Sequence, residues 1–186
     1  DFLAARDAFR AGDAVKLERF AQRLKNTPLE VYASYYRLHL GLENADARPV
    51  PSPSTSSGQA PHSGVEEAVK DFLSRPEDTP MIDRLRGEWL KQLGKKQQWD
   101  GFDAEYPRLL NEDTELTCYA LQSRLRSQEQ TALHEARRLW FSGKGQPDSC
   151  GPLFEAALSA GIISEPDIWQ RLRLTLEAGN VSLAKQ

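Results

Sequence analysis

The stretch LSAGIISEPDIW, residues 158–169, joins two helix-forming segments through a glycine, and it sets the pattern for the chain. FRAGDAVKLERF at 9–20, LKQLGKKQQWDGF at 90–102 and LEAGNVSLAKQ at 176–186 repeat the order of helix, glycine, and a polar or small residue that starts a new helix. Units of roughly 30–40 residues built in this way are typical of α-hairpin repeats, which bury their apolar faces by stacking. The predicted fold class is therefore all-α, a stack of helical hairpins.

Outside these turns, helix-forming residues dominate. Few runs alternate between apolar and polar residues, which is the pattern of a strand. Gly12 is expected to end the first helix and Asp13 to cap the second. Gly41 is expected to close the third helix, and Thr79 to cap a helix whose first residue is Pro80. The predicted helices are 3–11, 14–25, 29–41, 65–75, 80–96, 97–110, 112–126, 128–141, 152–160, 165–178 and 180–186.

Residues 43–64, ENADARPVPSPSTSSGQAPHSG, differ from the rest of the chain. This Pro/Ser-rich composition buries too little apolar surface to offset its ordering entropy. We predict a flexible insertion at 43–64 within one helical domain that covers 1–186. No capping repeat closes the pattern at Gln186, so we expect a neighbouring repeat beyond it.

Composition and charge exclude several classes of protein. The net charge is −3 and the pI about 5.7, whereas nucleic-acid-binding domains usually carry a basic excess. The mean hydropathy is −0.60, and no apolar run approaches the roughly 18 residues of a transmembrane helix. The first residues, DFLAARDAFR, do not form a signal peptide. With His39, His62 and His134 scattered and only two cysteines present, we expect neither a metal site nor a cofactor.

The two cysteines, Cys118 and Cys150, allow two interpretations. They are either free thiols in the core or one disulfide, and the cellular compartment decides between these states. A nucleophile formed by Cys118 and His134 is the less favoured functional alternative.

Other local patterns favour structural roles. Gly143-Lys144-Gly145 lacks the spacing of a phosphate-binding loop and is interpreted as a helix end and turn. The acidic pairs Glu66/Glu67 and Glu112/Asp113 are assigned to helix starts, where carboxylates suit the helix dipole. Aromatic faces stack on sugars, but spacing beside leucines favours inter-helix contacts for the four tryptophans, Trp89, Trp99, Trp140 and Trp169.

Two strings carry a specific resemblance: ARRLWFSGKGQPDSCGPLF at 136–154 and RLRLTLEAGNVSLAKQ at 171–186, with a weaker match in TCYALQSRL at 117–125. They resemble the amino-terminal superhelical region of the soluble lytic murein transglycosylase family. The resemblance implies a right-handed superhelix of hairpins that closes into a ring in longer members. It also implies a periplasmic location in a Gram-negative bacterium, with possible association with the cell wall or outer membrane, a precursor with a signal peptide, and a disulfide between Cys118 and Cys150.

The resemblance further implies that a separate lysozyme-like domain does the chemistry. In the family that domain is a lyase, which cleaves the β-1,4 bond between N-acetylmuramic acid and N-acetylglucosamine and leaves a 1,6-anhydro end. Its Glu-Ser, Gly-Leu-Met-Gln and Ala-Tyr-Asn motifs do not occur in this sequence, so no catalytic residue is expected here. The expected partners are peptidoglycan strands, through the parent enzyme, and the remaining superhelical and catalytic regions. The alternative function is a stand-alone helical-repeat module that binds a protein on its concave face.

Overall fold

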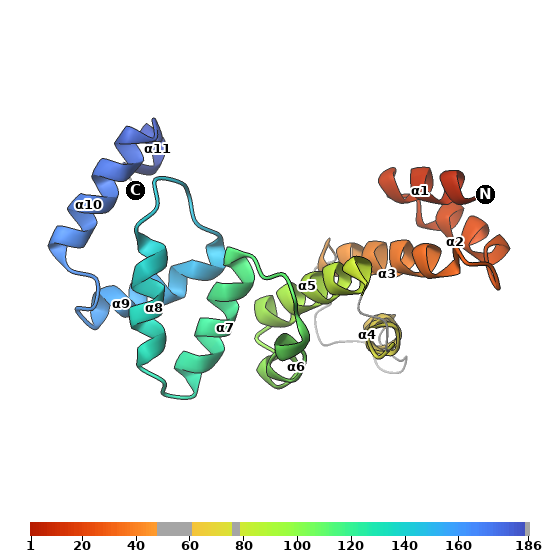
Figure 1. The fold of residues 1–186 in the computed structure, drawn as a ribbon, viewed down its shortest axis with the longest axis horizontal. Coiled ribbons are helices and arrows are strands. Elements are labelled where there is room, and N and C mark those ends of the chain that lie inside the picture. Colours follow the sequence, from red (N-terminus) through yellow and green to blue (C-terminus); the bar gives the residue numbers. More distant parts are fainter. Residues whose placement is uncertain (48–60, 76–78, 185–186) are drawn as a thin grey trace, which may run out of the picture. The chain divides into compact units, whose positions relative to one another are not determined.

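The computed structural model describes residues 1–47, 61–75 and 79–184. Within these ranges every regular element is a helix, which confirms the all-α prediction, and none of the helices is long and apolar enough to cross a bilayer. The chain divides into two compact units, residues 1–92 and 93–186. Figure 1 shows the helices in their order along the chain.

A short helical hairpin opens the first unit. The helices are α1 (Phe2–Arg10), α2 (Ala14–Arg23), α3 (Glu30–Ala47), α4 (Pro61–Leu73) and α5 (Pro80–Lys95), the last of which continues into the second unit. Gly12 takes φ 68° after α1, and Asp13 accepts a hydrogen bond of 2.9 Å from the Lys16 backbone N–H, as predicted. Figure 1 shows this hairpin folded against one end of α3.

Small and aliphatic side chains fill the core between α1, α2 and α3. The buried members are Ala5, Ala8, Leu17, Ala21, Leu24, Ala33 and Leu40. Aromatic rings close the edge of this core, where Phe9 stacks on Tyr36 with ring centroids 4.7 Å apart. The alanines let the helices approach closely, and the partly buried aromatic side chains pack against this core.

Gly41 does not end a helix, contrary to the prediction. Helix α3 continues to Ala47 and α4 begins at Pro61, so both ends of the predicted 43–64 insertion are helical. Gly41 lies where α4 packs on α3, and a Cβ atom there would lie 3.4 Å from Val65 Cγ1. Gly41 is thus a helix-interior residue at the contact with α4 and not a helix end. Residues 48–60, the centre of the predicted insertion, lie outside the described residues.

The second unit is built around a three-helix core. Its elements are α6 (Trp99–Glu105), the 3₁₀ turn η1 (Tyr106–Arg108), α7 (Thr114–Arg126), α8 (Thr131–Trp140), the 3₁₀ turn η2 (Asp148–Cys150), α9 (Gly151–Ser159), α10 (Glu165–Glu177) and α11 (Val181–Ala184). The core lies between α7, α8 and α9 (Figure 1). Its buried side chains are Cys118, Leu121, Ala132, Leu133, Ala136, Cys150, Leu153, Phe154, Ala157 and Ile163.

Two of the predicted glycine turns in the second unit hold, and in the third the glycine does not form the turn. Gly161 and Gly179 take φ 68° and 74° after α9 and α10, as expected of helix-ending glycines. Helix α5, however, runs through Gly94, and the left-handed residue after it is Gln97 at φ 57°. Gly94 is buried against Tyr119 of α7, where a Cβ atom would overlap the ring. Its small size is required for packing.

Candidate functional site

The acidic pair Glu112/Asp113 lies at a helix start, as predicted, and the pair Glu66/Glu67 does not. Asp113 caps α7 by accepting a hydrogen bond of 3.0 Å from the Leu116 N–H, and Glu112 accepts one from the Tyr106 hydroxyl. Glu66 and Glu67 lie inside α4 because this helix begins at Pro61, which corrects their predicted place at a helix start. The described part of the chain also contains no cluster of three or more His, Cys, Asp or Glu side chains that could hold a metal ion.

Cys118 and Cys150 form a disulfide across the core of the second unit. The bond connects α7 to η2 over a sequence separation of 32 residues, and both cysteines are fully buried. A disulfide sulfur offers no thiolate, so Cys118 has no nucleophile to pair with the exposed His134. The cysteines therefore fasten the segment after α8 to the helix before it.

Hydrogen bonds from neighbouring helices also hold the segment 141–150. Gln122 of α7 donates to the Ser149 carbonyl at 2.6 Å, and Gln146 donates to the Leu139 carbonyl at 2.8 Å. Helix α8 ends at Trp140, one residue before the predicted end, and Phe141 follows it with an ordinary negative φ. Gly143 instead approaches α10, where a Cβ atom would lie 2.7 Å from the Leu174 carbonyl oxygen.

An arginine–aspartate pair joins α8 to α10. The Arg137 guanidinium contacts both Asp167 oxygens, with Nε–Oδ2 3.0 Å and Nη2–Oδ1 2.6 Å. The backbone N–H and hydroxyl of Ser164 each donate to Asp167 Oδ2 at 2.9 Å. The hydrogen bonds from Arg137, and then those from Ser164, hold the pKa of Asp167 far below its usual range. A carboxylate that stays ionised in this way suits a structural joint and not a general acid.

Next to this joint lies a groove over α9, α10 and α11 with a volume of about 620 Å³. We call it the α9–α10 groove. Its walls are mainly apolar and include Trp140, Phe154, Leu158, Ile168, Trp169 and Leu172. The Arg171 guanidinium also lines it and lies over two rings, 4.1 Å from the Trp140 centroid and 5.4 Å from the Phe154 centroid. Burial lowers the pKa of Arg171 from its ordinary value.

The four tryptophans occupy different environments. Trp89 is buried in the first unit, and Trp99 packs edge-to-face against the buried Phe102 in the second. Trp140 contacts Phe154 edge-to-face and donates from Nε1 to the Asp167 carbonyl at 3.2 Å. Trp169 is the exposed one, at 56%. Glycan contact stays a prediction, and Trp169 is the tryptophan whose exposure suits it best.

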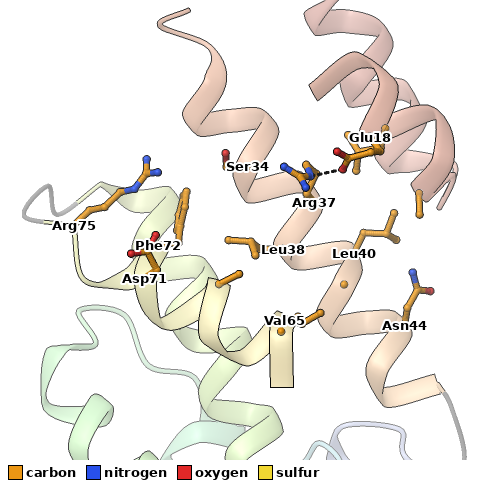
Figure 2. A pocket seen from close by; sticks show the side chains of 15 residues that line it. Glu18, Ser34, Arg37, Leu38, Leu40, Asn44, Val65, Asp71, Phe72 and Arg75 are labelled. Carbon is orange, nitrogen blue, oxygen red and sulfur yellow. Dashed lines mark ion pairs between the residues drawn. The ribbon is translucent and has the colours of Figure 1, made fainter. Parts of the chain in front are cut away.

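A second hollow, of about 440 Å³, lies in the first unit between α2, α3 and α4 (Figure 2). Charges of both signs line it above an apolar floor that includes Leu38 and Phe72. Glu18 is paired with Arg37 at 2.6 Å, and the Arg75 guanidinium lies 4.7 Å from the Phe72 centroid. Of its two lining acids, Glu18 and Asp71, Glu18 is held in an ion pair.

The chain is similar to part of longer known proteins. The chain is 26% identical over 168 residues to the soluble lytic murein transglycosylase of Salmonella typhimurium, and 25% identical to that of Escherichia coli K12. The chain resembles soluble lytic murein transglycosylases. These alignments cover 90% of the chain but 23% of either relative, so the chain spans about a quarter of their length. No protein-family profile matches it.

Solved structures of lytic transglycosylases share its fold. The 70 kDa soluble lytic transglycosylase of Escherichia coli matches 97% of the chain with a TM-score of 0.66 at 23% identity. An inactive mutant of the Pseudomonas aeruginosa lytic transglycosylase matches 96% with a TM-score of 0.67 at 31% identity. Each match covers 26% of the solved chain. The fold class is thus the helical, superhelical type of the lytic transglycosylases.

The sequence did not identify the residues that shape the α9–α10 groove, apart from Trp140 and Trp169. Arg137 stands in the quoted stretch 136–154, yet its partner Asp167 follows 30 residues later. Arg171 stands in the second quoted stretch, and local spacing does not indicate that its guanidinium lies on Trp140 and Phe154. These contacts connect separate helices, and hydrophobic periodicity reports only one helix at a time.

Proposed function

We propose that this chain is a helical scaffold portion of a peptidoglycan lytic transglycosylase. The observation that carries the proposal is the similarity over 90% of the chain to proteins named soluble lytic murein transglycosylase, of which it covers 23%. The sequence contains no Glu-Ser pair. Of the acidic pairs, Asp113 caps a helix, Glu112 binds the Tyr106 hydroxyl, and Glu66 and Glu67 lie within a helix. Bond cleavage in murein would then be the work of another part of a longer protein.

The proposed role of the scaffold is geometric. Stacked hairpins that continue into a ring would restrict how a glycan strand approaches a catalytic domain, and would favour strand ends over the interior. The longer protein would cleave the bond between N-acetylmuramic acid and N-acetylglucosamine and leave a 1,6-anhydro end. We place it in the periplasm, because the buried Cys118–Cys150 bond suits an oxidising compartment. Association with the cell wall or outer membrane is a further proposal, which fractionation of cells tests.

Digestion of purified peptidoglycan sacculi tests the proposed function. The 186-residue chain and the product of its full reading frame are incubated separately with sacculi, and anhydro-muropeptides are measured by mass spectrometry. We expect anhydro products from the longer protein and none from the chain alone. A longer product with its Glu-Ser glutamate replaced by glutamine serves as the inactive control.

Two outcomes would contradict the proposal. Anhydro products formed by the chain alone would place a catalytic acid among the helices described above. A full reading frame that yields no anhydro products, or that stops without a catalytic region, would favour the stand-alone interaction module instead.

A further inference from the structure

Arg171 has one guanidinium nitrogen that makes no hydrogen bond within the described residues. This atom, Nη1, is buried. The carboxylates nearest along the helices are occupied or turned to solvent: Asp167 binds Arg137 and Ser164, Glu165 accepts from Trp169 Nε1 at 3.3 Å, and Glu155 is exposed at the groove wall. A buried donor without an acceptor costs free energy, so it calls for an explanation.

The aromatic rings fix Arg171 in place. Its guanidinium lies 4.1 Å from the Trp140 centroid and 5.4 Å from the Phe154 centroid. Trp140 is itself held by its hydrogen bond to the Asp167 carbonyl. A planar guanidinium held in this manner keeps its fork of donors in one orientation, which suits the two oxygens of a carboxylate. The position is therefore preorganised for an acidic group.

The surroundings of Arg171 suit a protein surface better than a sugar. The α9–α10 groove is largely apolar, and three large side chains at its edge are exposed: Leu158 at 38%, Ile168 at 44% and Trp169 at 56%. Tryptophan and arginine on an otherwise largely apolar surface are typical of the buried part of a protein interface. A glycan site would present more hydrogen-bonding groups for the sugar hydroxyls.

We propose that Arg171 is the receptor for a carboxylate on an amphipathic helix that follows in the longer polypeptide and packs into the α9–α10 groove. This inference rests on the proposed function, because it requires the remaining length of the relatives, of which the chain covers 23%. The packing already present supports the choice of a helix, since α8 packs on α7 and α9 packs on α8. An Asp or Glu among the apolar residues of the next helix would form an ion pair with Arg171.

The test compares one substitution in two proteins. Arg171→Met removes the charge and the donors but keeps a long side chain against Trp140 and Phe154. In the 186-residue chain we expect it to leave Tm unchanged or to raise it, because the buried donor without an acceptor is gone. In the product of the full reading frame we expect it to lower Tm by about 5 °C or more, because a buried carboxylate loses its partner.

Arg173→Met is the matched control, since Arg173 is exposed on the same helix. It should shift Tm by less than about 1 °C in both proteins. Arg171→Lys should restore only part of the loss in the longer protein, since lysine keeps the charge but not the planar fork. Hydrogen–deuterium exchange of residues 165–177 in the longer protein gives a second measurement, in which Arg171→Met accelerates exchange and Arg173→Met does not.

Other outcomes would overturn the inference. Equal effects of Arg171→Met in both proteins would mean that the arginine serves only the fold of this chain. A reading frame without further helices would remove the proposed occupant. Soluble muropeptides that raise the Tm of the 186-residue chain through Arg171 would show a glycan or stem-peptide site in the groove instead. If the longer protein forms anhydro products while Arg171→Met has no effect, this inference fails and the proposed function stands.

Discussion

At the scale of single residues, Asp167 of α10 connects two parts of the second unit. Its carboxylate binds Arg137 of α8, and it also accepts two hydrogen bonds from Ser164, just before α10. It thereby stabilises the start of one helix and the contact with another at the same time. Few other residues in the second unit connect local and tertiary structure so directly.

The lowered pKa of Asp167 predicts how stability depends on pH. The folded pKa lies below the unfolded value of about 3.9, so the stabilisation is present above about pH 4. It is lost as the pH falls through the folded pKa. We expect Asp167→Asn to lower Tm by several degrees at pH 7 and to flatten the decline of Tm below pH 4. Thermal melts from pH 7 to pH 2 measure both effects.

Asp148→Asn is the control for this prediction, because Asp148 is an exposed aspartate of the same unit. Its Tm should follow that of the unchanged chain across the whole pH range. A decline for Asp167→Asn as steep as that of the unchanged chain would show that Asp167 is not a source of the acid sensitivity.

At the scale of helices, the ends were predictable wherever the signal lies in adjacent residues. Gly12 with Asp13, and Thr79 with Pro80, need only a left-handed turn or a side chain that caps the next helix. Gly41 and Gly94 differ from these helix ends, because each faces a side chain from a different helix. Sequence spacing does not reveal these contacts. Gly41 was wrongly interpreted as a helix end, whereas the predicted helix 80–96 already ran through Gly94.

Gly94→Ala tests the contact between Gly94 and the Tyr119 ring. The added methyl group would overlap the Tyr119 ring, so we expect the free energy of unfolding to fall by about 1–3 kcal/mol. Gly151→Ala, at the start of α9, meets nothing within 4 Å and should change it by less than about 0.5 kcal/mol. Urea denaturation of the two variants measures the difference. Equal stability of the two would mean that α5 and α7 adjust freely around Tyr119.

At the scale of the whole molecule, the class of fold was easier to predict than the site. Helix-forming composition and recurrent turns predicted an all-α chain, and the quoted strings supplied the resemblance that implied the disulfide. The α9–α10 groove depended on which side chains of α9, α10 and α11 converge, Arg171 above all. Such convergence follows from tertiary packing, which propensity and periodicity do not encode.

The disulfide predicts a difference between the two units. Closing a 32-residue loop stabilises the folded chain by about 3–4 kcal/mol in the loop-entropy model. Replacing both cysteines by alanine should therefore speed hydrogen–deuterium exchange in 93–186, which contains the bond, and leave exchange in the core of 1–92 unchanged. Thiol titration of the unreduced, denatured protein should find no free thiol. Two free thiols, or equal acceleration in both units, would contradict this prediction.

The same bond determines how the chain would carry mechanical load. Cys118 and Cys150 have Cα atoms 5.0 Å apart, whereas the 32 residues of separation would reach about 110 Å if pulled straight. Tension applied to the two ends of the chain would pass through the sulfur–sulfur link and bypass α8. Helix α8 and the segment 141–149 would then bear no force, because the disulfide carries it past them. The helices outside the loop would extend instead.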